Sequence, residues 1–166
     1  MTQGKYALVD NENYSFLNQW KWYAHLEHGN WYAIRNYGLR PFRKRIRMQQ
    51  VVLDTNNLVD HIDGNGLNNQ SRNLRLATNA QNLYNKDINK NNSTGYKGVH
   101  FNKIANKFQA GITIDGKKVY LGLFENVIDA AKKYDEKAVE FFGEFAKTNF
   151  DKKGVCRWEK RKSLNH

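Results

Sequence analysis

The C-terminal half of the chain changes its apolar spacing from every second residue to every third or fourth. The alternating apolar residues are Phe108, Ala110, Ile112 and Ile114, then Val119, Leu121 and Leu123. Asp115-Gly116, between the two sets, is a strong signal for a two-residue hairpin turn. Alternation of this kind buries one face of a sheet and leaves the other face polar.

A helical pattern follows directly. Its apolar residues are Val127, Ile128, Ala131, Tyr134, Ala138, Phe141 and Phe142. The apolar stripe of such a helix needs a surface to cover it, and the apolar face of the sheet has the same need. Residues 91–150 therefore predict a three-stranded antiparallel sheet packed on one helix, with the other face of the sheet free.

Residues 6–53 carry aromatic and β-favouring clusters separated by polar breaks. The clusters lie at 6–9, 20–24 and 31–34, and a polar break lies at 27–30. This arrangement favours a small sheet with a hairpin. Packing explains these aromatic residues better than base stacking, because so short a sheet needs large side chains to form a core. Pro41 is expected at a strand edge or an interruption.

These patterns predict an α+β fold in four parts. A small N-terminal β-rich region covers residues 1–55, a polar core region 56–90, the sheet-and-helix domain 91–150 and a basic tail 151–166. Residues 87–94 are polar enough to form a linker. The basic residues of the tail are Lys152, Lys153, Arg157, Lys160, Arg161 and Lys162. The sequence leaves open whether they contact phosphates or are disordered.

The polar core region places a carboxylate, Asp60, directly beside an imidazole, His61, and then supplies many amide side chains. Mg²⁺ prefers oxygen ligands and usually accepts one or two from the protein, while water and phosphate oxygens complete its shell. Asp60 and one amide oxygen would satisfy it. A neutral histidine can take a proton from water near pH 7. The pair therefore predicts a metal site with His61 as general base.

Neighbouring residues of a regular strand point to opposite faces. Asp60 and His61 can therefore reach one phosphate only where the strand ends or bulges. Asp63-Gly64 follows at once and is typical of the tip of a hairpin. We expect the strand to end there.

A helix is predicted to begin just after Thr78. Thr78 and Gln81 have the spacing of a capping box, in which the two side chains satisfy orphan backbone groups at a helix start. Asn82 would lie in the first turns of this helix, which makes it the expected second metal ligand. Asn85 or Lys86 would continue the same face.

The core region resembles the HNH nucleases of phages and introns, in their ββα-metal form. The resemblance is carried by residues 60–65, Asn68-Asn69, residues 71–75, Thr78 and Gln81-Asn82. It implies that Asp60 and Asn82 bind the metal and that His61 is the general base. It also implies that the amide of Asn73 braces the loop between the two strands and so holds the base.

Asn85 departs from the pattern of that family, whose members often have histidine there. Asn85 either supports the site indirectly or lies on a solvated helix face. Because asparagine is a weaker, neutral oxygen donor, Mg²⁺ or Mn²⁺ is favoured over Zn²⁺ as the one divalent metal.

The C-terminal domain resembles the Apetala-type DNA-binding domain of plant ethylene-response factors. The resemblance is carried by residues 95–99, 107–110, 120–124, 130–135 and 143–150. In that family, Arg and Trp side chains on three strands meet the major groove. Carried over by position, the expected DNA contacts are Lys97, His100, Lys107, Gln109, Thr113, Lys118 and Tyr120. Lys, His, Thr and Tyr lack the guanidinium group with which Arg makes bidentate contacts to guanine. For each expected contact, the alternative is that the side chain lies on a solvated strand face and does not bind DNA.

Charge points to the same partner. The chain has 166 residues and a formal net charge of +11, which suits the phosphates of double-stranded DNA. Arg43, Arg45 and Arg47 alternate, which would place three guanidinium groups on one strand face. A membrane surface is disfavoured, because this run lacks an apolar helical face and no stretch is long enough to span a bilayer. Cys156 is the only cysteine, which excludes an intrachain disulfide and fits a reducing, cytoplasmic location.

The sequence thus predicts a metal-dependent DNA endonuclease of the homing type, which leaves 5′-phosphate and 3′-hydroxyl ends. One active site per chain predicts nicking of one strand, so that a double-strand break needs a second protomer, for example in a homodimer on DNA. A non-catalytic DNA-binding regulator with a decayed nuclease core is the alternative. An RNA-binding module is disfavoured, because the stacking motifs of single-strand recognition are missing.

Overall fold

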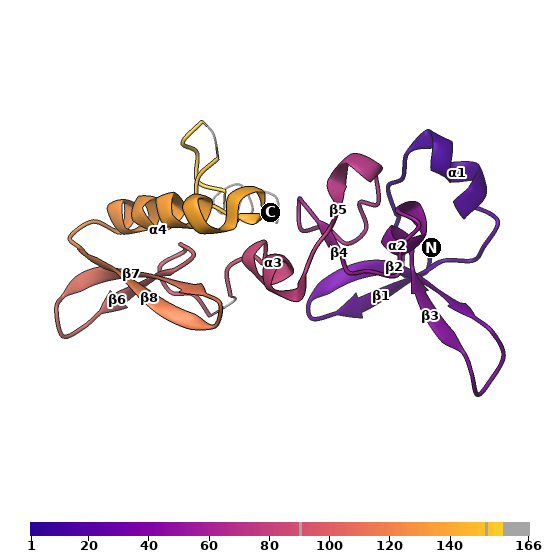
Figure 1. The fold of residues 1–166 in the computed structure, drawn as a ribbon, viewed down its shortest axis with the longest axis horizontal. Coiled ribbons are helices and arrows are strands. Elements are labelled where there is room, and N and C mark those ends of the chain that lie inside the picture. The colour runs from indigo at the N-terminus through magenta and orange to yellow at the C-terminus, as the bar shows by residue number, and fades with distance from the viewer. Residues whose placement is uncertain (90, 152, 158–166) are drawn as a thin grey trace. The chain divides into compact units, whose positions relative to one another are not determined.

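The computed structural model describes residues 1–89, 91–151 and 153–157, and it divides into two compact units (Figure 1). The first unit is Met1–Asn79, and the second runs from Ala80 to the C-terminus. The division falls inside the region 56–90 that the sequence groups as one nuclease core. The four-part division of the chain stays a prediction. Lys152, Lys160, Arg161 and Lys162 of the basic tail lie outside the described residues.

The first unit contains a three-stranded antiparallel sheet in the order β1-β2-β3. Its elements in chain order are α1 (Asn11–Leu17), β1 (Tyr23–Glu27), β2 (Asn30–Tyr37), β3 (Lys44–Arg47) and α2 (Met48–Val52). The turn between β1 and β2 is made by His28 and Gly29, both with positive φ. This is the hairpin that the aromatic clusters predict. Pro41 lies between β2 and β3.

The core of this sheet forms around Leu17, Ala33 and Met48, which come from α1, β2 and α2. The two helices were not predicted, because each is short and buries only one or two residues, too few for a visible helical period. Residues 6–9, expected in the sheet, form no strand. Only an isolated bridge joins Leu8 to Asn68.

A second, two-stranded sheet of the first unit pairs β4 (Val59–His61) with β5 (Leu74–Leu76), which follows the short 3-10 helix η1 (Ser71–Asn73). In the antiparallel register, Asp60 lies opposite Arg75. Gly64 N donates to His61 O at 2.8 Å, so a turn ends β4 where the sequence predicts it. The expectation of a hairpin tip was wrong, because the chain continues through the long loop of residues 62–73 before it returns in β5.

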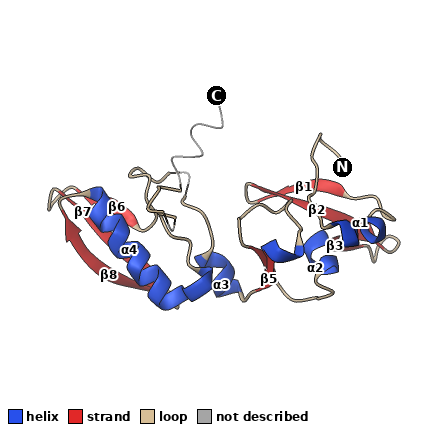
Figure 2. Ribbon diagram, turned by 90° about the horizontal axis from the view of Figure 1, so that it is seen from above, coloured by secondary structure: helices blue, strands red, loops and turns tan. Residues whose placement is uncertain are grey.

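The second unit confirms the predicted sheet on a helix. Its elements are α3 (Asn79–Tyr84), β6 (Val99–Asn102), β7 (Lys107–Ile114), β8 (Lys117–Phe124), α4 (Val127–Phe142) and η2 (Gly143–Phe145). α3 begins directly after Thr78, as expected, and all of it except Asn79 belongs to this unit. The sheet order is β6-β7-β8, and α4 lies across one face of the sheet (Figure 2). The molecule is therefore α+β.

Two buried clusters hold α4 to the sheet. One contains Val99, Ala110, Ala130 and Ala131; the other contains Ile112, Tyr134, Ala138 and Phe142. Most residues of the predicted helical stripe are in these clusters, but Ile128 and Phe141 are 39% and 50% exposed, respectively. Asn126 starts the helix, because its side chain accepts a hydrogen bond from Ile128 N.

A β-bulge breaks the alternation expected in β8. Ala110 pairs with Gly122 and Gly111 pairs with Tyr120, which leaves Leu121 as an extra residue. Leu121 packs against both buried clusters. Beyond the bulge, Leu123 lies opposite Gln109 on the free face, so its predicted place on the apolar face was wrong. No helix among the described residues is long and apolar enough to cross a membrane.

Candidate functional site

Asp60 is a buried carboxylate held by the opposite strand. Its side chain lies in the middle of β4, and Arg75 of β5 donates to its Oδ2 from Nε at 2.9 Å and from Nη2 at 2.8 Å. Both partners are nearly inaccessible, with side-chain exposures of 5% and 11%. A buried carboxylate needs such a partner, because the loss of its hydration is costly. Arg75 therefore pairs with the buried carboxylate and holds Asp60 in position.

His61 is the last residue of β4 and is also buried. Its Nε2 lies 3.3 Å from Oδ1 of Asn69, and its ring centroid lies 6.0 Å from that of Tyr32. Burial lowers the pKa of His61 below its ordinary value of 6.5, although Asn69, Asp63 and Asp60 all act in the opposite direction. The imidazole is therefore neutral at pH 7, as a general base must be.

Asn69 determines which nitrogen of His61 is basic. An amide oxygen only accepts, so its contact with Nε2 places the proton of the neutral ring there and leaves the lone pair on Nδ1. Asn69 is fully buried, and its backbone N–H donates to Leu8 O at 2.7 Å. The N-terminal segment thus helps to hold the residue that orients the histidine.

Asn73 ties the loop of residues 62–73 together. Its Oδ1 accepts from Asp63 N at 3.1 Å, and its Nδ2 donates to Asp63 Oδ1 at 3.0 Å and to Asn68 O at 2.8 Å. Ile62 N also donates to Asn73 O at 2.9 Å. These bonds join both ends of the loop directly after His61. The catalytic effect of Asn73 stays a prediction.

The loop packs closely on β2. A Cβ at Gly66 would lie 2.5 Å from Trp31 O and 2.6 Å from the ring of Tyr32, so only glycine fits without a shift. Asn30 Nδ2 donates to Gly64 O at 2.8 Å across the same contact. The N-terminal sheet therefore helps to hold the loop of residues 62–73 in place.

Two arginines of the basic run, Arg45 and Arg47, contact other side chains of the first unit. Arg45 and Arg47 share one face of β3, but Arg43 precedes the strand, so the prediction of three guanidiniums on one strand face was wrong. Arg47 pairs with Glu27 at 2.7 Å and lies over the ring of Tyr32 at 5.3 Å. Arg45 Nη1 lies 3.2 Å from His25 Nε2. Arg43 and Arg45 are exposed and Arg47 is half-buried.

Asn82 and Asn85 belong to the second unit. Asn82 is exposed on α3, whereas Asn85 is buried, follows the end of the helix and donates its backbone N–H to Gln81 O at 3.2 Å. The structure thus brings Asp60, His61 and Asn73 together in the first unit, with the two other candidates in the second. Within the described part of the chain, no group of three or more His, Cys, Asp or Glu residues could hold a metal ion.

The free face of the second sheet gathers most of the candidate DNA contacts. Strand register places His100 beside Gln109, and Thr113 beside Lys118. The residues on this face are His100, Asn102, Lys107, Gln109, Gly111, Thr113, Lys118, Tyr120 and Leu123. Three of them have side-chain partners within the domain: Lys107 pairs with Glu125 at 2.7 Å, and Asn102 Nδ2 donates to Gln109 Oε1 at 3.0 Å.

Lys97 lies apart from this face. Its Nζ donates to Tyr84 O at 2.7 Å and to Lys86 O at 2.6 Å. Burial and the nearby charge of Lys147 lower its pKa to about 8. Its ammonium is therefore directed at backbone carbonyls rather than at the open surface.

A relative covers most of the chain. A protein of Acanthamoeba polyphaga mimivirus, named as an uncharacterized HNH endonuclease, is 32% identical over 152 residues, which are 89% of this chain and 76% of the relative. The chain belongs to the HNH endonuclease family. HNH membership implies a divalent metal. A carboxylate such as that of Asp60 and an amide oxygen such as that of Asn82 are ligand types that suit Mg²⁺ or Mn²⁺, and the metal-binding role of these two residues stays a prediction.

Shorter similarities include a phage protein and plant transcription factors. Protein 3.8 of Escherichia phage T7 is 40% identical over 60 residues, which are 36% of this HNH chain and 50% of that protein. An AP2-like ethylene-responsive transcription factor of Arabidopsis thaliana is 41% identical over 58 residues, which are 35% of this chain and 12% of the factor. The similarity to plant AP2-like factors is thus partial. No protein-family model matches the chain.

The sequence pattern indicated no individual role for three residues that lie close to Asp60 or His61. Arg75 and Asn69 belong to the HNH motif, and Tyr32 lies in an aromatic cluster. Arg75 could have been found from strand register, because a residue opposite Asp60 in an antiparallel pair is its neighbour. Asn69 and Tyr32 carry no such signal, since their contacts with His61 depend on how a long loop folds.

Proposed function

We propose that this HNH protein is a metal-dependent, site-directed DNA endonuclease of the homing type. It hydrolyses one phosphodiester per active site to 5′-phosphate and 3′-hydroxyl ends, and thereby nicks one strand. The observation that carries the proposal is the buried His61 at the end of β4, adjacent to Asp60 and oriented through Nε2 by Asn69. A buried neutral imidazole beside a carboxylate suits proton transfer from water.

The chain's own residues have defined tasks in this reaction. Nδ1 of His61 takes a proton from the water whose oxygen attacks phosphorus, and the bond from phosphorus to the 3′ oxygen breaks. The departing 3′ alkoxide takes a proton from a solvent water to become the 3′-hydroxyl, and the imidazolium of His61 returns its proton to solvent. Asn73 keeps the loop after His61 closed, and Arg75 keeps Asp60 in place. A divalent Mg²⁺ or Mn²⁺ on Asp60 and Asn82 would supply positive charge for the phosphate and the departing oxygen.

Double-stranded DNA is the proposed partner. The net charge of +11 favours phosphate contacts. Arg45 on β3, and His100, Lys118 and Tyr120 on the free face of the second sheet, are exposed and open to a duplex. The partial similarity to AP2-like factors supports the second unit as the DNA-reading part.

A plasmid assay tests the proposal. We expect the protein to nick supercoiled plasmid with Mg²⁺ or Mn²⁺, and to lose this activity with EDTA. Removing the general base by His61→Asn should lower the rate by about 100-fold or more. The matched control is His28→Asn in the β1–β2 turn, where φ is +49° and asparagine is tolerated. Nicking that survives His61→Asn would remove His61 as the base.

A DNA-binding regulator without nuclease activity is the second candidate. The ion pair between Asp60 and Arg75 favours it, because a carboxylate oxygen occupied by guanidinium is less available to a metal. Under this alternative, the wild-type protein binds duplex DNA and cleaves none of it with any divalent metal. The same plasmid assay distinguishes the two functions.

A further inference from the structure

The helix that carries Asn82 is too short to be stable by itself. α3 has six residues, and none of them is buried. Isolated helices of this length do not persist, because fixing the first turn is unfavourable and few hydrogen bonds follow. The order of α3 must therefore come from tertiary contacts, and its C-terminal end has several within the second unit.

Tyr84, the last residue of α3, is attached to the core of the second unit. Its ring stacks on that of Phe142 of α4, with centroids 3.8 Å apart and planes 9° from parallel. Its hydroxyl donates to Asp115 Oδ1 at 3.3 Å, in the turn between β7 and β8. It also packs against the buried cluster that contains Ile112 and Tyr134. One end of α3 is thus joined to both layers of the sheet-and-helix domain.

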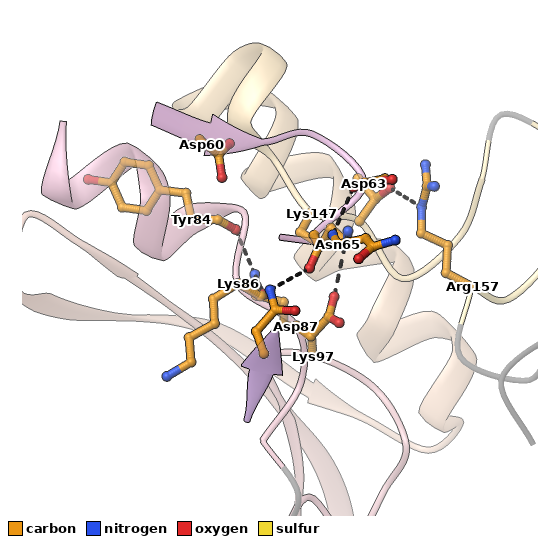
Figure 3. Close-up of polar contacts among 12 residues, drawn as sticks. Asp60, Asp63, Asn65, Tyr84, Lys86, Asp87, Lys97, Lys147 and Arg157 are labelled. Atoms are coloured by element: carbon orange, nitrogen blue, oxygen red, sulfur yellow. Dashed lines mark hydrogen bonds and ion pairs between the residues drawn. The ribbon is translucent and has the colours of Figure 1, made fainter. Parts of the chain in front are cut away.

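Lys97 closes the same end of the helix. Its two hydrogen bonds reach the carbonyls of Tyr84 and Lys86 (Figure 3). The last carbonyls of a helix lack intrahelical partners, and a cation there satisfies them and interacts favourably with the helix dipole. Next to this contact, Lys147 pairs with Asp87 at 3.5 Å, so the segment after α3 is held as well.

Lys97 is itself held in position by the core. Oδ1 of Asn149 accepts from Lys97 N at 2.6 Å, and Nδ2 donates to Lys97 O at 3.1 Å. Asn149 is fully buried, and its Nδ2 also donates to Asp135 Oδ1 of α4 at 2.9 Å. A continuous series of hydrogen bonds therefore runs from α4 through Asn149 and Lys97 to the end of α3.

We propose that Lys97 is a positioning residue, which fastens the helix of the metal ligand Asn82 to the DNA-reading unit and does not contact DNA. This inference rests on the proposed function, in which Asn82 binds the metal. Because α3 is attached to the sheet-and-helix domain, Asn82 moves together with the surface that reads DNA. Cleavage is thereby tied to recognition.

Hydrogen exchange in the metal-free, full-length protein tests the attachment directly. Lys97→Met removes the ammonium and keeps the length of the side chain. We expect the amides of residues 80–87 to exchange about tenfold faster or more, the scale of one lost charge-assisted hydrogen bond. Lys132→Met, on the exposed surface of α4, is the matched control and should leave these amides unchanged. Unchanged exchange in Lys97→Met would overturn the proposal.

DNA binding and nicking separate this role from a phosphate contact. Lys97→Met should bind plasmid duplex within about twofold of wild type, because no phosphate contact is lost. At saturating DNA it should nick more slowly and need more Mg²⁺, and Lys97→Arg should restore part of the rate. Lys118→Met, on the free face, should show weaker DNA binding with normal exchange at 80–87. If Lys97→Met behaves like Lys118→Met, Lys97 is a DNA contact and the proposal is wrong.

A second variant covers the case in which Lys97→Met unfolds the second unit. Tyr84→Leu removes the stacking and the hydroxyl contact but keeps an apolar side chain, and we expect the same rapid exchange with normal DNA binding. Slow exchange in this variant would contradict the attachment. If the wild-type protein nicks no DNA, the proposed function fails, while exchange and DNA binding still decide whether Lys97 fastens α3.

Discussion

His61 shows how burial sets the chemistry of a single side chain. In water an imidazole is partly protonated near pH 6.5, and a protonated ring cannot accept a proton from water. The cost of burying a charge lowers the pKa of His61, and this effect exceeds the opposing effects of Asn69, Asp63 and Asp60. Asn69 then selects the nitrogen that carries the lone pair. Both effects depend on how the chain packs around the ring, which the motif alone does not specify.

A titration of the metal-free protein tests this balance. We expect the NMR midpoint of His61 to lie below 6.5, the ordinary value, which the protein unfolded in urea should show. In the interval between the two values, the unfolded chain binds more protons than the folded chain. The free energy of unfolding should therefore decrease as the pH falls through this interval. A midpoint at or above 6.5 in the folded protein would contradict the dominance of burial.

At the scale of elements, short segments are held by packing more than by their own pairing. β4 and β5 have three residues each, and the loop between them is closed by the side chain of Asn73. In the second unit, the approach to β6 passes under α4 so closely that Gly98 faces the ring of Tyr134. Glycine is required there for space as well as for its positive φ of 75°.

Two glycines with the same φ provide a matched test of this packing. A Cβ at Gly98 would lie 2.0 Å from the ring of Tyr134, whereas a Cβ at Gly95 would meet nothing within 4 Å, and both have a φ of +75°. Both alanine variants have the same cost of a positive φ at a residue with a Cβ. The difference between their free energies of unfolding therefore measures the steric clash with Tyr134. We expect Gly98→Ala to lower the free energy of unfolding by roughly 1–3 kcal/mol more than Gly95→Ala.

Native-state hydrogen exchange of the α4 amides measures this difference in the second unit alone. If both variants lower the free energy of unfolding equally, α4 can move away from the segment that precedes β6. The contact between a Cβ at position 98 and Tyr134 would then be relieved without a loss of stability.

At the scale of the whole molecule, the two units divide the proposed tasks. The first unit contains the buried His61, which is the proposed base, and the carboxylate of Asp60, and the second contains the free sheet face and α3. Each unit has its own core, so substitutions in one core should act mainly on that unit. The proposed active site occurs once per chain, which limits what a single molecule can do to a duplex.

The order of plasmid products tests the single site. We expect open circles to form first at a rate proportional to protein concentration, and linear DNA to follow by a second, independent cut or through a homodimer on DNA. Gel analysis of supercoiled, open-circular and linear DNA over time measures both steps. Linear DNA formed in one encounter by a protein proven monomeric would contradict one active site per chain.

The sequence by itself determined the features that depend on local pattern. Alternating residues specified β7, helical spacing specified α4, and Asp63-Gly64 ended β4, because these signals act between residues close along the chain. The order of Asp60, His61, Asn73 and Asn82 was enough to indicate the family.

Only the tertiary structure decided which side chains support the candidate site. The contact of Asn69 with His61 and the contact of Lys97 with the end of α3 join segments whose approach depends on loop shape. The bulge at Leu121 likewise depends on fitting two strands to one helix. Such contacts carry no periodic signal, since many loop conformations suit the same polar residues until packing selects one.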